Sequence, residues 1–101
     1  MSYRVIYRAG SSVEKSVRYY NVFHSSEALE DIYHTFHTGK IHAEKITIYK
    51  LQEHNRYTDS WDDRLEKAVE NFENHKCAHG EVTKDDILVE GNKIILERKK
   101  T

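Results

Sequence analysis

The chain has 101 residues, of which 38% are hydrophobic and 33% are charged, and its formal net charge is −1 at pH 7. A chain of this length predicts one domain, residues 1–101, with a thin core, and its apolar runs are shorter than the ~20 residues of a transmembrane helix. A single cysteine, Cys77, excludes an internal disulfide framework and favours a reducing compartment, so we expect a cytoplasmic protein.

The first two predicted elements are strands that pair as a hairpin. Residues 2–9 alternate between two faces, and residues 15–23 alternate again after a turn at residues 10–12. Two strands so close in sequence are expected to pair antiparallel.

A helix is predicted next, over residues 25–38. Its apolar residues recur at helical spacing, and Gly39 stands where a C-terminal glycine belongs. The serine pair at 25–26 is expected to cap its N-terminus. A third strand is predicted over residues 44–52, and the polar residues 53–59 are expected to form a loop.

The most strongly patterned stretch is residues 60–75. Its apolar residues fall at i, i+4, i+7, i+8 and i+11, which indicates a helix with one buried stripe. We expect Ser60 to be the N-cap, with Asp63 completing a capping box. Trp61 and Phe72 are the largest side chains of the stripe, so both are expected in the core.

After that helix we expect a loop over residues 76–81, a short turn capped by Thr83 and Asp86, and a final hairpin. The hairpin strands, residues 87–89 and 94–96, flank a Gly-Asn loop. The predicted order is therefore β-β-α-β-α-β-β. This order predicts an α+β single domain, a mostly antiparallel sheet with two helices on one face.

The tail, residues 98–101, is expected to fray. Catalytic motifs are missing from the sequence. The four glycines are too scattered for a phosphate loop, and no Gly-x-Ser-x-Gly or His-Glu-x-x-His occurs. We therefore expect a non-enzymatic protein without a cofactor.

Histidine is abundant, with seven residues, and three potential zinc ligands lie close together at His75, Cys77 and His79. His34 or His37 could supply a fourth ligand if the two helices lie side by side. The spacing differs from the usual zinc knuckles, however, and we expect no bound metal. A thiol nucleophile at Cys77 with a histidine base is a further alternative.

The sheet face opposite the helices is the candidate binding surface. If Val5, Val17 and Tyr19 face the helices, the opposite face combines arginines, tyrosines and aliphatic side chains. Its predicted members are Arg4, Ile6, Arg8, Arg18, Tyr20, Val22, Tyr49 and Leu51. Such a composition is typical of a protein interface, and a basic aromatic sheet face also binds single-stranded nucleic acid.

Charge is unevenly distributed along the chain. Residues 1–24 carry four basic residues and one acidic residue, whereas residues 57–76 carry six acidic residues and three basic ones. This asymmetry can steer two subunits together head to tail. We expect a small regulatory protein that binds a protein partner and forms a homodimer. RNA or single-stranded DNA binding is the second hypothesis, and a zinc-binding or Cys/His enzyme is the third.

Overall fold

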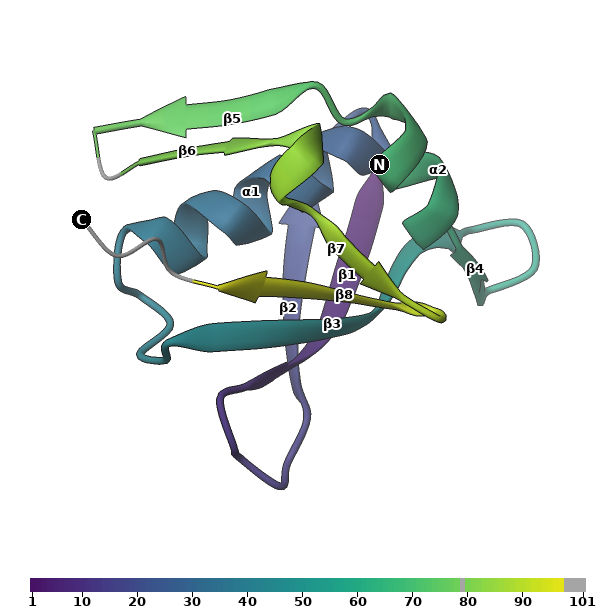
Figure 1. Cartoon of the computed structure of the whole chain (residues 1–101). Coiled ribbons are helices and arrows are strands. Elements are labelled where there is room, and N and C mark those ends of the chain that lie inside the picture. The colour runs from purple at the N-terminus through teal and green to yellow at the C-terminus, as the bar shows by residue number, and fades with distance from the viewer. Residues whose placement is uncertain (79, 98–101) are drawn as a thin grey trace.

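A computed structural model describes residues 1–78 and 80–97 of the chain (Figure 1). It has the predicted α+β architecture, and the predicted order gains three strands, β4, β5 and β6. The predicted fraying of residues 98–101 lies outside the described residues. In chain order the elements are β1 (Ser2–Ala9), β2 (Ser16–Asn21), α1 (Ser25–His37), β3 (Lys45–Asn55), β4 (Ser60–Asp63), α2 (Leu65–Asn71), β5 (Asn74–Cys77), β6 (Gly80–Thr83), the 3₁₀ turn η1 (Lys84–Asp86), β7 (Leu88–Glu90) and β8 (Lys93–Glu97).

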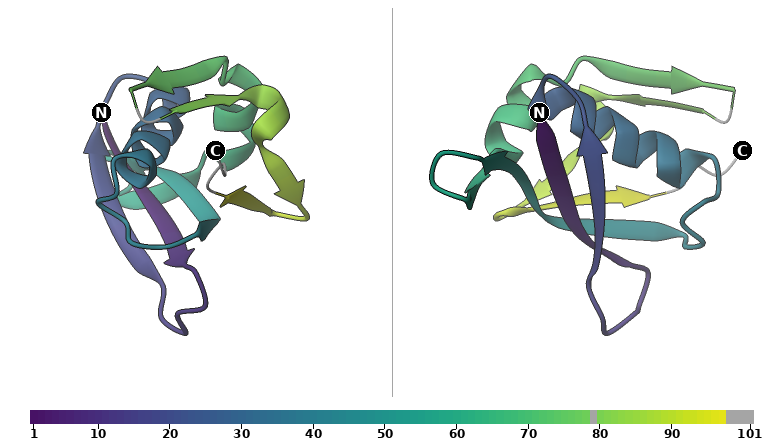
Figure 2. Two further views of the ribbon diagram at one scale, coloured as in Figure 1. Left: turned by 60° about the vertical axis from the view of Figure 1, so that its left-hand side comes forward. Right: turned by 180° about the vertical axis from the view of Figure 1, so that it is seen from behind.

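The strand pairings within the described residues are all antiparallel. The main sheet has the order β2-β1-β3-β8-β7, and β4 also pairs with β3, whereas β5 and β6 form a two-stranded sheet of their own. Figure 2 shows the main sheet curving around α1, with the β5–β6 hairpin on the other side of the helix. The concave side of the main sheet is therefore the side that α1 covers.

One hydrophobic core fills the space between this concave side and the helices. The strands contribute the inward-facing residues of β1, β3 and β8, and α1 contributes one apolar stripe. The ring of Phe72, just after α2, meets Tyr33 edge-on with 5.4 Å between centroids. The buried apolar residues include Tyr3, Val5, Tyr7, Ala28, Leu29, Ile32, Tyr33, Phe36, Ile46, Ile48, Leu51, Ala68, Phe72, Val82, Ile94 and Leu96.

The helix predicted over residues 60–75 is wrong in its first turn. Ser60 is a strand residue of β4 and not an N-cap, and α2 begins only after β4 ends. The antiparallel pairing of β4 with β3 places Trp61 opposite His54. Trp61 therefore leaves the core, whereas Phe72 stays in it with 2% of its surface exposed.

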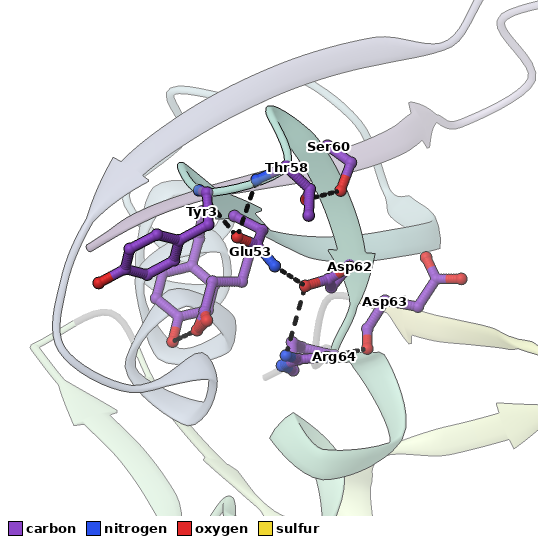
Figure 3. Close-up of polar contacts among 9 residues, drawn as sticks. Tyr3, Glu53, Thr58, Ser60, Asp62, Asp63 and Arg64 are labelled. Atoms are coloured by element: carbon purple, nitrogen blue, oxygen red, sulfur yellow. Dashed lines mark hydrogen bonds and ion pairs between the residues drawn. The ribbon is translucent and has the colours of Figure 1, made fainter.

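The loop between β3 and β4 explains why the chain turns back as a hairpin. The Asn55 Oδ1 atom accepts the backbone N–H groups of Tyr57 and Thr58 at 3.0 and 3.4 Å. This side chain thus organises the tight loop in the manner of an Asx turn. Beyond the loop, Asp62 points toward Arg64 with 3.7 Å between the charged atoms (Figure 3). Residues 60–63 therefore form a strand paired with β3, although their apolar spacing is that of a helix.

The C-terminal hairpin forms as the sequence predicts. Asp86 Oδ2 accepts the Thr83 backbone N–H at 2.9 Å and the Thr83 hydroxyl at 3.1 Å, which caps the short turn η1. Strands β7 and β8 then pair with Glu90 opposite Lys93, and Gly91 occupies the turn with a φ of 62°. These features depend on neighbouring residues only.

The first helix ends before Gly39, which has a φ of 83°, as predicted. Its expected serine cap is wrong, because the N-cap residue is His24 and Ser25 is the first helical residue. Neither this helix nor any other in residues 1–78 and 80–97 has the length and apolar character needed to cross a membrane.

We expect Tyr33→Phe to stabilise the fold by about 1 kcal/mol, because an unsatisfied buried hydroxyl costs about 1–3 kcal/mol. The Tyr33 hydroxyl is buried without a hydrogen-bond partner among the described residues, and burial raises the pKa of Tyr33. Chemical denaturation of both proteins measures the change. Tyr20→Phe is the matched control and should destabilise, since it removes the 3.2 Å contact with the Thr35 hydroxyl. A lower stability for Tyr33→Phe would contradict this account.

Candidate functional site

Strand β1 defines the two faces of the main sheet. Tyr3, Val5 and Tyr7 point inward and are buried, as the alternation predicts. The convex side, away from α1, is here called the outer face. From β1 it receives Arg4, Ile6 and Arg8, which are half-buried and lie on the face that the alternation predicts.

Strand β2 presents the opposite set of side chains from the predicted one. Its pairing with β1 puts Tyr20 opposite Tyr3, Tyr19 opposite Arg4, and Val17 opposite Ile6. Tyr20 and Val22 pack against the core, and burial raises the pKa of Tyr20. Arg18 lies on the same side and donates to the Tyr7 hydroxyl at 3.2 Å. The predicted outward positions of Arg18, Tyr20 and Val22 are therefore wrong, because a shift of one residue in register exchanges the two faces of a strand.

On strand β3, one of the two predicted outward positions is wrong and the other is confirmed. Leu51 pairs with Val5 and is completely buried, so its predicted outward position is wrong. Tyr49 is the extra residue of a β-bulge that lies opposite the step from Ile6 to Tyr7. Its ring is half-buried and meets cations of the outer face, as described below.

An aromatic group that the sequence reading missed lies at one end of the outer face. The Arg4 guanidinium lies 4.3 Å from the Trp61 ring centroid, and the rings of His54 and Tyr19 lie 5.1 and 6.1 Å from it. Tyr19 remains 67% exposed. Arg4, Tyr19, His54 and Trp61 are together called the aromatic group. Its three rings border an open hollow of about 350 Å³ that Ser2, Tyr20 and Asn21 also line.

A second, basic group surrounds Tyr49 on the same face. The side-chain nitrogens of Lys15 and Lys93 lie 4.5 and 5.1 Å from the Tyr49 ring centroid, and the Arg8 guanidinium carbon lies 5.8 Å away. Such cation–π contacts hold the cations close to the sheet. The outer face thus places an aromatic group next to a concentration of positive charge.

The arrangement of these rings limits what they can bind. A base that stacks on Trp61 must displace Arg4, and one that stacks on Tyr49 must displace cations that already lie near its ring. Carboxylates, in contrast, can reach the same cations without moving them. Apolar side chains can contact Tyr19 and the 43% exposed Val17. These contacts suit a protein surface, and the exposed ring of Tyr19 also leaves room for a stacked base.

One reason explains why the sequence did not predict the outward positions of Val17, Tyr19 and Trp61. Each was assigned to the core by a local pattern, an alternating strand for the first two and a helical stripe for Trp61. Both faces of β2 carry bulky residues, so composition alone does not say which face meets the helix. The pairing register with β1 supplies that information.

The histidine and cysteine residues are brought together at a different place, between α1 and the β5–β6 hairpin. His75 and Cys77 lie on β5, which replaces the expected end of helix and loop. His34 Nδ1 is 3.2 Å from His75 Nε2, and Cys77 Sγ is 3.8 Å from His37 Nδ1. Burial and the neighbouring His34 lower the pKa of His75, which favours its neutral form. His79 lies outside the described residues.

Comparison with protein family models, with curated proteins and with solved structures finds no match to this chain. The site is therefore interpreted from its own residues. Two features of the described chain can carry a function, the outer face of the main sheet and the histidine–cysteine cluster beside α1.

Proposed function

We propose that this chain is a small cytoplasmic binding protein that associates with a second copy of itself through the outer face. The observation that carries the proposal is the exposure of Val17 and Tyr19 on β2, with the Tyr19 ring beside Trp61, in a face lined with cations. Exposed apolar side chains that adjoin one another on a sheet are typical of an interaction surface. Aromatic and arginine residues are also the side chains that most often dominate binding energy at interfaces.

The chain itself offers a surface with complementary charge. Helix α2 and the residue after Phe72 display the exposed carboxylates Glu66, Glu70 and Glu73. Phe23, which is 76% exposed, borders a separate hollow that Arg64 and Lys67 line and that none of these three glutamates lines. The second surface is therefore formed by these carboxylates alone. We call it the acidic surface.

The charges on the outer face and the acidic surface distinguish two ways in which two copies can associate. Two outer faces pressed together would oppose Arg4, Arg8 and Lys15 with their own copies, and like charges repel. An outer face against an acidic surface pairs cations with carboxylates. We therefore propose a head-to-tail contact, in which the outer face of one copy meets the acidic surface of another, and repetition of this contact closes a ring or extends a chain. A dimer is the first product of such a contact.

This geometry predicts complementation between two variants that each fail alone. Tyr19→Asp removes the exposed ring and places a carboxylate against the glutamates of the other copy, and Glu66→Lys with Glu70→Lys reverses the charge of the acidic surface. Each variant should be monomeric in analytical ultracentrifugation at concentrations where the wild type associates. Their equimolar mixture should form a dimer, because one intact surface of each kind remains. Higher salt should weaken the association.

Two controls make this experiment decisive. Val17→Asp should behave as Tyr19→Asp does, whereas Val13→Asp, at a 92% exposed loop position outside the face, should associate as the wild type does. A monomeric wild type, or a mixture that stays monomeric, contradicts the proposal. If Tyr19→Asp instead weakens binding of a fluorescent single-stranded RNA in an anisotropy titration, nucleic-acid binding replaces protein binding as the function of this face.

A further inference from the structure

Two pairs of potential metal ligands face one another across the gap between α1 and β5. His34 and His37 are three residues apart on α1, so they lie on one side of the helix. His75 and Cys77 are two residues apart on β5, so they point to one face of the strand. The two elements are in contact, and both views of Figure 2 show the hairpin running along the helix.

The distances within this cluster approach those of ligands around a single ion. The ligand atoms of His34, His75 and Cys77 lie within 4.8 Å of one another. The His34–His75 and His37–Cys77 pairs are closer, at 3.2 and 3.8 Å. Zinc bonds of about 2.0–2.1 Å to nitrogen and about 2.3 Å to sulfur, at tetrahedral angles, separate ligand atoms by about 3.3–3.6 Å. Small side-chain movements would bring the ligand atoms of His34, His75 and Cys77 to one zinc ion, and His37, with its Nδ1 beside Cys77 Sγ, is the fourth candidate ligand.

We propose that His34, His37, His75 and Cys77 bind one Zn²⁺ ion in a tetrahedral site. Imidazole and thiolate are the ligands that zinc prefers, and a set of three histidines and one cysteine leaves no open position. Binding displaces the thiol proton of Cys77, and the histidines bind as neutral rings. The spacing of these ligands in the sequence argues against zinc, whereas their arrangement in space favours it. This proposal is independent of the proposed self-association.

The position of the cluster gives the ion a structural role. Among the described residues, the β5–β6 hairpin pairs with no strand of the main sheet, and a two-stranded hairpin alone is only marginally stable. Its main anchor in the core is the buried Val82. Zinc held by two ligands from α1 and two from β5 would fix the hairpin to the helix. Metal binding should therefore raise the stability of the whole fold.

The test uses the full chain, purified without a histidine tag from medium that contains zinc. Elemental analysis should find one equivalent of zinc, and a chelator should remove it with a fall in melting temperature. Cobalt(II) added to the zinc-free protein should give the visible absorption of a tetrahedral site and a thiolate charge-transfer band. Alkylation of Cys77 by iodoacetamide should be slow with zinc and fast without it.

Variants then assign the ligands. Loss of a hydrogen-bond partner of a metal ligand usually lowers metal affinity by about 10-fold to 100-fold. We expect each of the variants His34→Gln, His75→Gln and Cys77→Ser to weaken zinc binding by more than this. His37→Gln should change the cobalt spectrum and also weaken binding. His42→Gln, at an exposed position outside the four proposed ligands, should bind as the wild type does. Melting curves of the zinc-free variants show whether each one is folded.

Several results would overturn the proposal. One is a wild-type protein that contains far less than one equivalent of zinc and gives no tetrahedral cobalt spectrum. Another is an unchanged affinity for zinc in His34→Gln and Cys77→Ser. Loss of the cobalt spectrum in His79→Gln but not in His37→Gln would overturn the ligand set. A Cys77 thiol that alkylates rapidly whether or not zinc is present would point to a reactive Cys77–His37 pair instead of a metal site.

Discussion

Phe72→Ala is expected to destabilise the fold by about 3–5 kcal/mol, the usual cost of removing a buried phenylalanine ring. Phe72 is 2% exposed and its ring packs edge-on against Tyr33, the largest fully buried side chain. The substitution leaves a cavity at the point where α2 meets α1. A domain of this size is stable by only about 5–15 kcal/mol, so a large share of its stability is lost. Thermal and urea denaturation measure the change.

Trp61→Ala is the informative comparison, because the helical pattern assigns both residues to the core. Trp61 lies on β4 with its ring partly exposed on the outer face, where it contacts Arg4 and Tyr19. We expect its removal to cost about 1 kcal/mol, the scale of aromatic and cation–π contacts at exposed sites. Equal costs for the two variants would mean that residues 60–75 pack as one helix after all.

Leu51→Asp is expected to prevent folding, with a cost above about 4–5 kcal/mol. The Leu51 side chain is completely buried against Val5 on the concave side of the sheet. A carboxylate there loses its hydration and finds no partner, which is among the most costly changes in a protein core. Far-ultraviolet circular dichroism and the dispersion of amide signals in NMR spectra report the loss of structure.

The control for this variant is the preceding residue. Lys50 is exposed on the outer face, so Lys50→Asp should change the stability by no more than about 0.5 kcal/mol. The two substitutions differ by one position in the strand and therefore test its register directly. A folded Leu51→Asp protein with a wild-type melting temperature would return Leu51 to the outer face, where the alternation alone had placed it.

The candidate site could be predicted only in part. The alternation in β1 correctly places Arg4, Ile6 and Arg8 on the outer face, because its inward positions are all large and apolar. The same reasoning fails for β2, where Tyr19 and Tyr20 are alike in character. The histidine and cysteine residues of the cluster could be recognised in the sequence as potential metal ligands. The strand β5, which aligns His75 with Cys77, could not be predicted.

The sequence by itself determined those elements whose signals lie within a few residues. They are the alternating strand β1, the amphipathic helix α1 with Gly39 after its end, and the hairpin at Gly91. Tertiary structure decided the rest, because pairing with β3 outweighs the helical spacing at residues 60–63. Pairing with β1 also selects which face of β2 is buried. Contact between α1 and β5 brings His34 to His75, 41 residues further along the chain. Such choices depend on which long-range contacts bury the most apolar surface and satisfy the most backbone hydrogen bonds, and a local pattern does not contain that information.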